Sequence, residues 1–201
     1  MANLITAGRL ALLFVVVALA YRETAAWRLA AAPLLILTFA LDGVDGWVAR
    51  RRGEVSLFGA AFDIAADRIV ENVLWVALAD LDLVPVWVAF VFLTRSFLVD
   101  SMRAHAAARG ETAFGMMRTR LGRFLVAGRL MRVVYATTKA AVFCWILLLE
   151  PASELSPGLW IRWGPTLQTV TAALTGAALF LCLARGLPVL AELAFAPEAQ
   201  A

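Results

Sequence analysis

Long apolar runs alternate with short polar segments along the whole chain. Each run has at least 16 residues. Because a helix rises 1.5 Å per residue, helices of these lengths can cross most or all of a bilayer core of about 30 Å. No alternation of period two marks any segment as a strand. The pattern therefore predicts about six transmembrane helices, at residues 4–21, 27–48, 56–79, 84–99, 126–149 and 166–183.

The segments between the runs predict how the helices are joined. A basic loop at 50–53 is expected to end the second helix, and residues 102–123 are expected to form a helical extension followed by an interfacial loop. Trp160 and Trp163 are expected in a loop at the membrane surface, where tryptophan is enriched. Residues 195–201 are expected to be frayed.

The first run also resembles a signal peptide, because Ala18-Leu19-Ala20 has the small-residue form of a cleavage site. No cluster of basic residues precedes the run, and the run is long enough to cross the membrane. We therefore expect a retained helix.

Composition supports an integral membrane protein. Of the 201 residues, 63% are hydrophobic and 16% charged, and the mean hydropathy is +0.83. The net charge of +3 is small and dispersed, and no basic stretch is interleaved with stacking aromatic residues, which excludes a nucleic-acid binder. The expected fold is a single all-α membrane bundle over residues 1–201.

The arginines predict the orientation of this bundle. The segments after the second and fourth runs are rich in arginine, whereas those after the first, third and fifth are poor. The rich segments hold Arg50, Arg51, Arg52, Arg103, Arg109, Arg118, Arg120, Arg123 and Arg129, against Arg22, Arg28 and Arg162 in the others. The positive-inside rule then places both termini, and the facing ends of the second and third helices, in the cytoplasm. Arginine-rich composition with a single lysine is compatible with a bacterial plasma membrane.

Four carboxylates lie at these facing ends. Asp42 and Asp45 are three residues apart, and Asp63 and Asp67 are four apart, so each pair lies on one helix face. If the two helices are antiparallel neighbours, the pairs converge, and four such carboxylates need a counter-charge. Oxygen ligands without Cys or His favour two Mg²⁺ or Mn²⁺ ions.

Two other interpretations of these acids stay open. The aspartates can pair with Arg50, Arg51, Arg52 and Arg68 in an interfacial salt-bridge network, although their spacing is not explained by pairing alone. Glu71 continues the face of Asp63 and Asp67, and either supports the metal ligands or pairs with an arginine. Small residues between the acids leave room for close approach of a helix or a ligand phosphate, namely Gly43, Gly46, Ala49, Gly59, Ala60 and Ala61.

The stretch 42–67 resembles the signature of the CDP-alcohol phosphotransferases, D-x2-D-G-x2-A-R-x8-G-x3-D-x3-D. The matching residues are Asp42, Asp45, Gly46, Ala49, Arg50, Gly59, Asp63 and Asp67. Asn3, Thr6 and Arg9 also resemble a pattern in the first helix of many members.

The resemblance implies transfer of a phosphatidyl or similar group from a CDP-linked donor to an alcohol, with release of CMP, by an enzyme of phospholipid synthesis that forms a homodimer. It implies that Asp42 and Asp63 bridge two metal ions, that Asp45 completes one site, and that Asp67 ligates the second ion and acts as the base. It places the donor against Gly46, Arg50 and Ser56, and against the signature and first-helix residues Ala49, Gly59, Asn3, Thr6 and Arg9.

Cations within apolar runs suggest an acceptor site. Arg95 lies in the fourth run, and Arg132 and Lys139 lie seven residues apart in the fifth, on one helix face. With the neighbouring Arg118, Arg120 and Arg129, they are candidates for binding a phosphorylated alcohol. The alternative is attraction of anionic lipid at the cytoplasmic surface.

Three functions follow as hypotheses. The first is phosphatidyl transfer from CDP-diacylglycerol to an alcohol whose identity the sequence does not give. The second reverses the roles, with a soluble CDP-aminoalcohol as donor and diacylglycerol as acceptor. The third is a cation-binding transporter or noncatalytic membrane protein, which the lack of acidic residues in the first and last runs disfavours.

Overall fold

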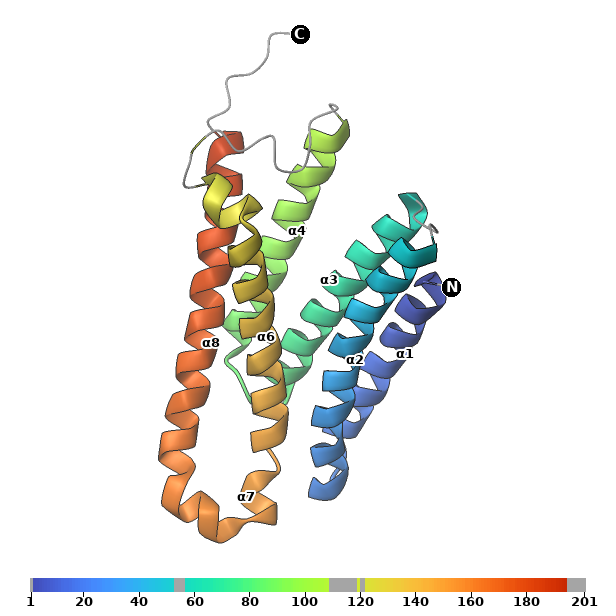
Figure 1. Cartoon of the computed structure of the whole chain (residues 1–201). Helices are drawn as coiled ribbons and strands as arrows, with labels where there is room; N and C mark the ends of the chain where they lie inside the picture. The colour runs from blue at the N-terminus through green and yellow to red at the C-terminus, as the bar shows by residue number, and fades with distance from the viewer. Residues whose placement is uncertain (1, 53–56, 109–118, 120–121, 195–201) are drawn as a thin grey trace.

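The structure is a computed structural model that describes residues 2–52, 57–108, 119 and 122–194, without the side chains of residues 2, 45–50, 52, 106, 108 and 192–194. Within these ranges the chain is helical and contains no strand, which confirms the all-α prediction. Figure 1 shows the helices α1 (Ala2–Ala20), α2 (Ala25–Arg52), α3 (Leu57–Asp80), α4 (Val86–Ala108), α6 (Arg129–Leu149), α7 (Ala152–Leu155) and α8 (Pro157–Ala194). A short π-helix, η1 (Arg123–Ala127), precedes α6.

The long helices pack as a closed ring. Helix α1 packs on α2 and α3, α2 packs on α6, α3 on α4, and both α4 and α6 on α8. The interior is filled by aromatic side chains from three helices: the ring of Trp75 lies 4.2 Å from that of Phe92 and 4.7 Å from that of Phe143. All three are almost fully buried. Packing of this kind, rather than a hydrophobic drive, holds helices together in lipid.

Four described helices are long and apolar enough to cross a membrane, with candidate spans at Asn3–Ala20, Ala25–Val44, Arg129–Leu155 and Pro157–Ala191. The other two long helices, α3 and α4, carry several charged residues within their apolar sequence, among them Asp63, Asp67, Glu71 and Arg95. The charged residues that make α3 and α4 less apolar than the other long helices therefore also take part in the site described below.

Several predicted boundaries are wrong, including those of the last helix, which runs from Pro157 to Ala194 and not from 166 to 183. Helix α2 continues to Arg52 instead of ending in a loop at 50–53, because arginine is a good helix former and the first glycine in that loop is residue 53. Trp160 and Trp163 lie in the first turns of α8 and not in a loop. Pro157 is the first residue of α8, where proline fits, and the helix continues through Pro165.

The turn between α3 and α4 is short and well satisfied. Asp82 has φ 57°, Leu83 N–H donates to the Leu78 carbonyl at 2.9 Å, and Asp82 N–H donates to Ala79 at 3.1 Å. This is a Schellman cap in which Asp82 takes the position usually held by glycine. The cap closes the end of the bundle opposite the charged residues of α3.

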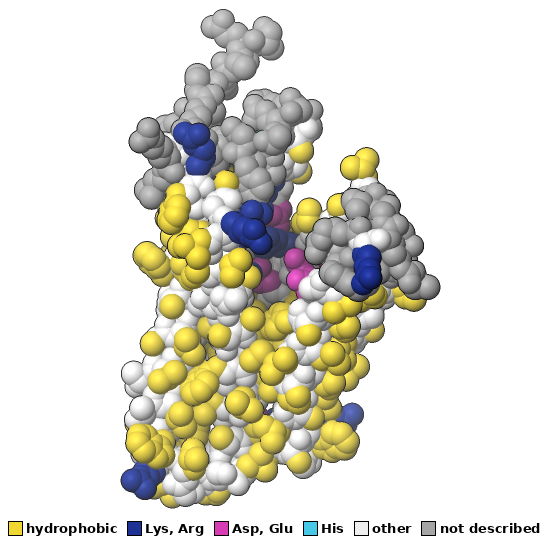
Figure 2. Space-filling model, in the orientation of Figure 1, with side chains coloured by type: hydrophobic (Ala, Val, Ile, Leu, Met, Phe, Trp, Pro, Cys, Tyr) yellow, Lys and Arg dark blue, Asp and Glu magenta, His cyan; other side chains and the backbone are white. Residues whose placement is uncertain are grey.

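The charged residues gather at the other end. Figure 2 shows a hollow between the N-terminal helices and the α4, α6 and α8 group, with acidic and basic side chains inside it and mainly apolar side chains over the rest of this face. Helix α1 begins near this end and α8 ends there (Figure 1).

Candidate active site

Three of the predicted metal ligands lie together at the hollow. Asp42 comes from α2 and Asp63 and Asp67 from successive turns of α3, and one carboxylate oxygen of each lies within 4.8 Å of the others. Their side chains are 44, 47 and 50% exposed, so ions and solutes from water can reach them. The predicted convergence of the two pairs is therefore met for these three acids.

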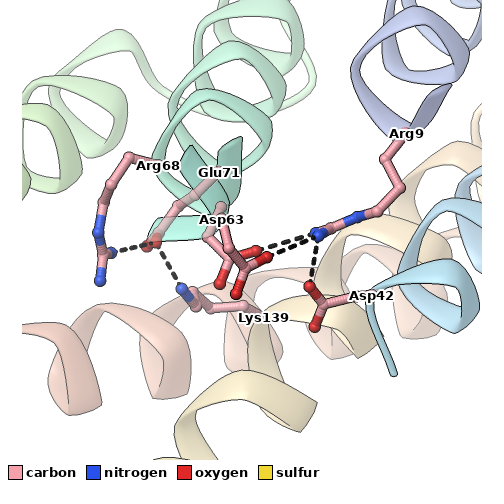
Figure 3. Close-up of polar contacts among 7 residues, drawn as sticks. Arg9, Asp42, Asp63, Arg68, Glu71 and Lys139 are labelled. Carbon is pink, nitrogen blue, oxygen red and sulfur yellow. Dashed lines mark hydrogen bonds and ion pairs between the residues drawn. The ribbon is translucent and has the colours of Figure 1, made fainter. Parts of the chain in front are cut away.

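The contact that joins them comes from α1, which the spacing argument did not include. Arg9 Nη1 lies 2.6 Å from Asp42 and 3.3 Å from Asp63, and Nη2 lies 2.9 Å from Asp67. Figure 3 shows the guanidinium lying between Asp42 and Asp63. Since α1 packs against both α2 and α3, the two acidic helices are linked through α1, not simply as antiparallel neighbours.

The donor set fits a hard divalent cation. Mg²⁺ binds oxygen at about 2.1 Å, which puts neighbouring ligand oxygens about 3 to 4 Å apart. The three carboxylate oxygens, within 4.8 Å of one another, need only small side-chain rotations to reach that spacing. No Cys or His takes part in this group. The chemistry of the group therefore suits Mg²⁺ or Mn²⁺ better than zinc or copper.

Several predicted site residues, the metal ligand Asp45 among them, lie outside what the structure describes. The side chains of Asp45, Gly46, Ala49 and Arg50 in α2 are not described, and neither is Ser56. Of the first-helix residues, Asn3 is exposed, whereas Thr6 is buried on the same face as Arg9. Gly59 is partly buried near the start of α3.

Glu71, one turn beyond Asp67 on α3, is the centre of a second cluster. Its buried carboxylate accepts hydrogen bonds from Arg68 Nη1 at 2.8 Å, Lys139 Nζ at 2.6 Å and Tyr135 Oη at 3.1 Å. Figure 3 shows Arg68 and Lys139 meeting at Glu71. Pairing of Glu71 with a cation, one of the two alternatives, is thus what the structure shows. Arg68 also pairs with Asp100 at 2.9 Å.

Three cations surround the ring of Tyr135. Lys139 Nζ lies 4.2 Å from the ring centroid, and the guanidinium carbons of Arg185 and Arg95 lie at 5.5 and 5.6 Å. They come from α6, α8 and α4 respectively. Together with Arg68, and with Arg103 at 3.9 Å from Asp100, this makes five cations around two carboxylates, Glu71 and Asp100. An excess of buried positive charge beside the aspartates is suited to binding an anion.

Local backbone features hold two of these arginines in place. Arg185 Nη1 donates to the Leu125 carbonyl at 2.6 Å and Nη2 to the Val126 carbonyl at 3.3 Å, both within η1. Arg95 packs on Gly186, where a Cβ would lie only 2.8 Å from Arg95 Cγ. The glycine therefore permits the approach of α4 and α8 at the level of the cluster.

The structure divides the predicted acceptor residues. Arg95 and Lys139 lie in the cluster, Arg132 is exposed on α6 one turn before it, and Arg129 is exposed at the first residue of α6. Arg118 and Arg120 lie outside the described residues.

Arg185 and Tyr135 were missed by the sequence argument. Arg185 is a cation in an apolar helix, the same signal that identified Arg95, but the predicted run ended at residue 183 and left it outside. A single buried tyrosine gives no comparable signal, because tyrosine is common in membrane helices.

Comparison with known proteins shows the family to which the sequence is related. A sequence model of the CDP-alcohol phosphatidyltransferase family matches residues 1–195. A CDP-diacylglycerol–glycerol-3-phosphate 3-phosphatidyltransferase of Pseudomonas fluorescens is 30% identical over 150 residues, which is 73% of this chain and 76% of the relative.

Other similarities are more local. The enzyme of the same name from Bacillus subtilis is 34% identical over 90 residues, which is 45% of this chain and 47% of that protein. A CDP-diacylglycerol–inositol 3-phosphatidyltransferase of Arabidopsis thaliana is 46% identical over 48 residues, 24% of this chain and 21% of the plant protein. The chain thus spans about half the length of the Bacillus relative, and less of the plant protein.

Proposed function

Because this chain belongs to the CDP-alcohol phosphatidyltransferase family, we propose that it transfers the phosphatidyl group of CDP-diacylglycerol to a phosphorylated alcohol and releases CMP. The observation that carries the proposal is the position of the aspartate group directly beside a buried cluster of cations. One turn of α3 separates Asp67 from Glu71, at the centre of that cluster. A reactive phosphate and a second, anionic substrate can therefore bind side by side.

Asp42, Asp63 and Asp67, together with Asp45, are the residues that would hold two Mg²⁺ or Mn²⁺ ions. When bound, such ions neutralise the pyrophosphate and stabilise the leaving CMP. The chain positions these ligands on two helices. About half of each side chain of Asp42, Asp63 and Asp67 is exposed, so the ions can reach them from water. Gly46, Ala49, Arg50, Ser56 and Gly59 remain proposed contacts of the donor.

The chemical step is an in-line displacement at the phosphorus that carries the diacylglycerol. The acceptor oxygen forms a bond to this phosphorus while the pyrophosphate P–O bond breaks, and the bridging oxygen leaves with CMP. Asp67 takes the proton of the attacking hydroxyl. The reaction therefore exchanges the phosphoanhydride bond of the donor for a phosphoester bond to the acceptor.

The acceptor is proposed to be phosphorylated because of the cluster around Tyr135. Arg95, Lys139 and Arg185 present positive charge where a neutral alcohol would gain nothing from it. Relatives named for glycerol 3-phosphate are consistent with such a substrate, whereas the plant relative is named for inositol.

The test offers purified protein CDP-diacylglycerol with Mg²⁺ or Mn²⁺ and a panel of alcohols, scored by CMP release. Glycerol 3-phosphate and inositol 1-phosphate should support release, and glycerol, inositol and serine should support much less. Release with the free alcohols alone would contradict the proposed acceptor class. No release with any alcohol, but release from a soluble CDP-aminoalcohol with diacylglycerol, would favour the reversed reaction.

Two variants connect this activity to the site. Asp67→Asn keeps the shape but cannot accept the proton, and we expect at least a ~100-fold loss of the rate of CMP release. Arg185→Gln should raise the KM for the phosphorylated alcohol about tenfold, by loss of one charge-assisted contact. Arg162→Gln, an exposed arginine at the opposite end of the bundle, is the control. An Asp67→Asn protein as active as the native chain would rule out the base.

A further inference from the structure

Arg9 supplies to the three aspartates the positive charge that a bound metal cation would otherwise supply. Its side chain is only 2% exposed, and its two terminal nitrogens contact carboxylates of α2 and α3 at 2.6, 2.9 and 3.3 Å. Figure 3 shows that these contacts are made from α1, so the guanidinium draws together acids from two separate helices. A single positive charge cannot neutralise three carboxylates, so the group keeps an affinity for further cations.

The proposed reaction requires the same oxygens for other purposes. Asp42 and Asp63 must present oxygen lone pairs to metal ions, and Asp67 must accept a proton. A carboxylate oxygen that accepts a short hydrogen bond from a guanidinium is a weaker ligand and a weaker base. The contacts of Arg9 seen here are therefore incompatible with the working state of the site.

We propose that Arg9 is an exchangeable internal counter-ion: it holds Asp42, Asp63 and Asp67 together before divalent cations bind, and moves to the donor's phosphate when they do. The inference rests on the proposed function, since it assumes that these aspartates bind the metal ions. It goes beyond that function by coupling metal binding and donor binding through one side chain.

The guanidinium is suited to both partners. Its planar fork of N–H groups matches the two oxygens of a carboxylate and equally those of a phosphate. On leaving the aspartates it needs a new anion, because an unpaired charge on a buried side chain is costly. The phosphate of an incoming CDP-linked donor is such an anion, so cations and donor should each favour binding of the other.

The experiment measures Mn²⁺ binding by electron paramagnetic resonance on the full chain in nanodiscs, without substrate. Arg9→Gln removes the competing charge and should bind Mn²⁺ about tenfold more tightly than the native chain. Arg9→Lys keeps the charge but not the fork, and should give an intermediate affinity. Arg162→Gln removes an arginine at the opposite end and should bind as the native chain does.

A second titration measures coupling, with CDP as the probe. In the native chain, saturating Mn²⁺ should tighten CDP binding about tenfold or more, because Arg9 becomes available to the phosphate. In Arg9→Gln the same addition of Mn²⁺ should change CDP affinity by a smaller factor. Thermal unfolding of each variant establishes that it is folded. If Arg9→Gln is not folded, Arg9→Lys is compared with the native chain instead.

The outcomes separate this inference from the function on which it rests. Equal or weaker Mn²⁺ binding in Arg9→Gln would show that Arg9 does not compete with the metal, and would overturn the inference while leaving the metal site intact. Absence of Mn²⁺ binding in every protein would overturn the metal assignment itself, and the inference with it.

Discussion

At the scale of single residues, Glu71 is a buried carboxylate in contact with two cations. It is 7% exposed and holds Arg68 from its own helix and Lys139 from α6. Removing one partner of a buried ion pair leaves the other charge uncompensated, which costs far more than the pair contributes. Glu71 therefore holds Lys139 in its position beside Tyr135.

We predict that Glu71→Gln lowers the free energy of unfolding by about 3 kcal/mol. Adding Lys139→Met to this variant should recover part of the loss, because it removes the stranded ammonium. Glu154→Gln is the matched control: Glu154 pairs with Arg28 but is 57% exposed, so its loss should cost less than about 1 kcal/mol. Unfolding of the detergent-solubilised proteins measures all three.

Equal free energies of unfolding for Glu71→Gln and Glu154→Gln would contradict a stabilising role of the buried contacts of Glu71. A larger effect of Glu71→Gln on the KM for the phosphorylated alcohol than for CDP-diacylglycerol is also expected, since Lys139 belongs to the cations around Tyr135 that we propose bind the acceptor, and not to the aspartate group.

At the scale of elements, the junction of η1 and α6 positions an arginine of the last helix. Gly128 separates the two, with φ −56° and ψ 125°, and its N–H donates to Arg123 and Phe124 carbonyls. A Cβ at Gly128 would lie 2.1 Å from the Phe124 carbonyl oxygen, which no side chain rearrangement can relieve. The π-helix it terminates carries the two carbonyls that bind Arg185.

Gly128→Ala is therefore expected to shift η1, to lower the free energy of unfolding by about 1–3 kcal/mol, and to weaken acceptor binding through Arg185. Gly176→Ala provides the comparison, because a Cβ there meets nothing within 4 Å and alanine favours the helix. Unfolding temperature and the KM for the phosphorylated alcohol are the measurements. Unchanged values for Gly128→Ala would show that the junction does not position Arg185.

At the scale of the whole molecule, Arg28 pairs with Glu150 and Glu154 at one end of the ring of helices, and the acidic and basic side chains of the site lie at the opposite end (Figures 1 and 2). The arginine distribution predicts that the end with the site faces the cytoplasm. CDP-linked donors and divalent cations are available there. The orientation and the homodimer both stay predictions.

Cysteine labelling tests the orientation. In a background with Cys144→Ala and Cys182→Ala, Arg123→Cys should react with a membrane-impermeant maleimide only from the cytoplasmic side, and Ser156→Cys only from the opposite side. Both native residues are exposed, and they lie before and after α6, which crosses the bundle. The reverse pattern would overturn the predicted orientation and, with it, the cytoplasmic site.

The sequence by itself determined the helices and the spacing of the acids. Apolar runs longer than about 16 residues permit little except helices in lipid, because each backbone polar group must be satisfied within its own segment. The spacing of Asp63 and Asp67 is likewise a local property, since residues four apart share a helix face. These features need no knowledge of how the helices pack.

Only the tertiary structure decided which charges meet. Arg9 and Asp67 are 58 residues apart, and Arg185 and Leu125 are 60 apart, so no local pattern relates them. Their contacts depend on α1 lying against both α2 and α3, and on α8 passing η1. Packing of helices in lipid is set by the summed fit of many side chains, and it is this fit that turned separate acids and cations into one site.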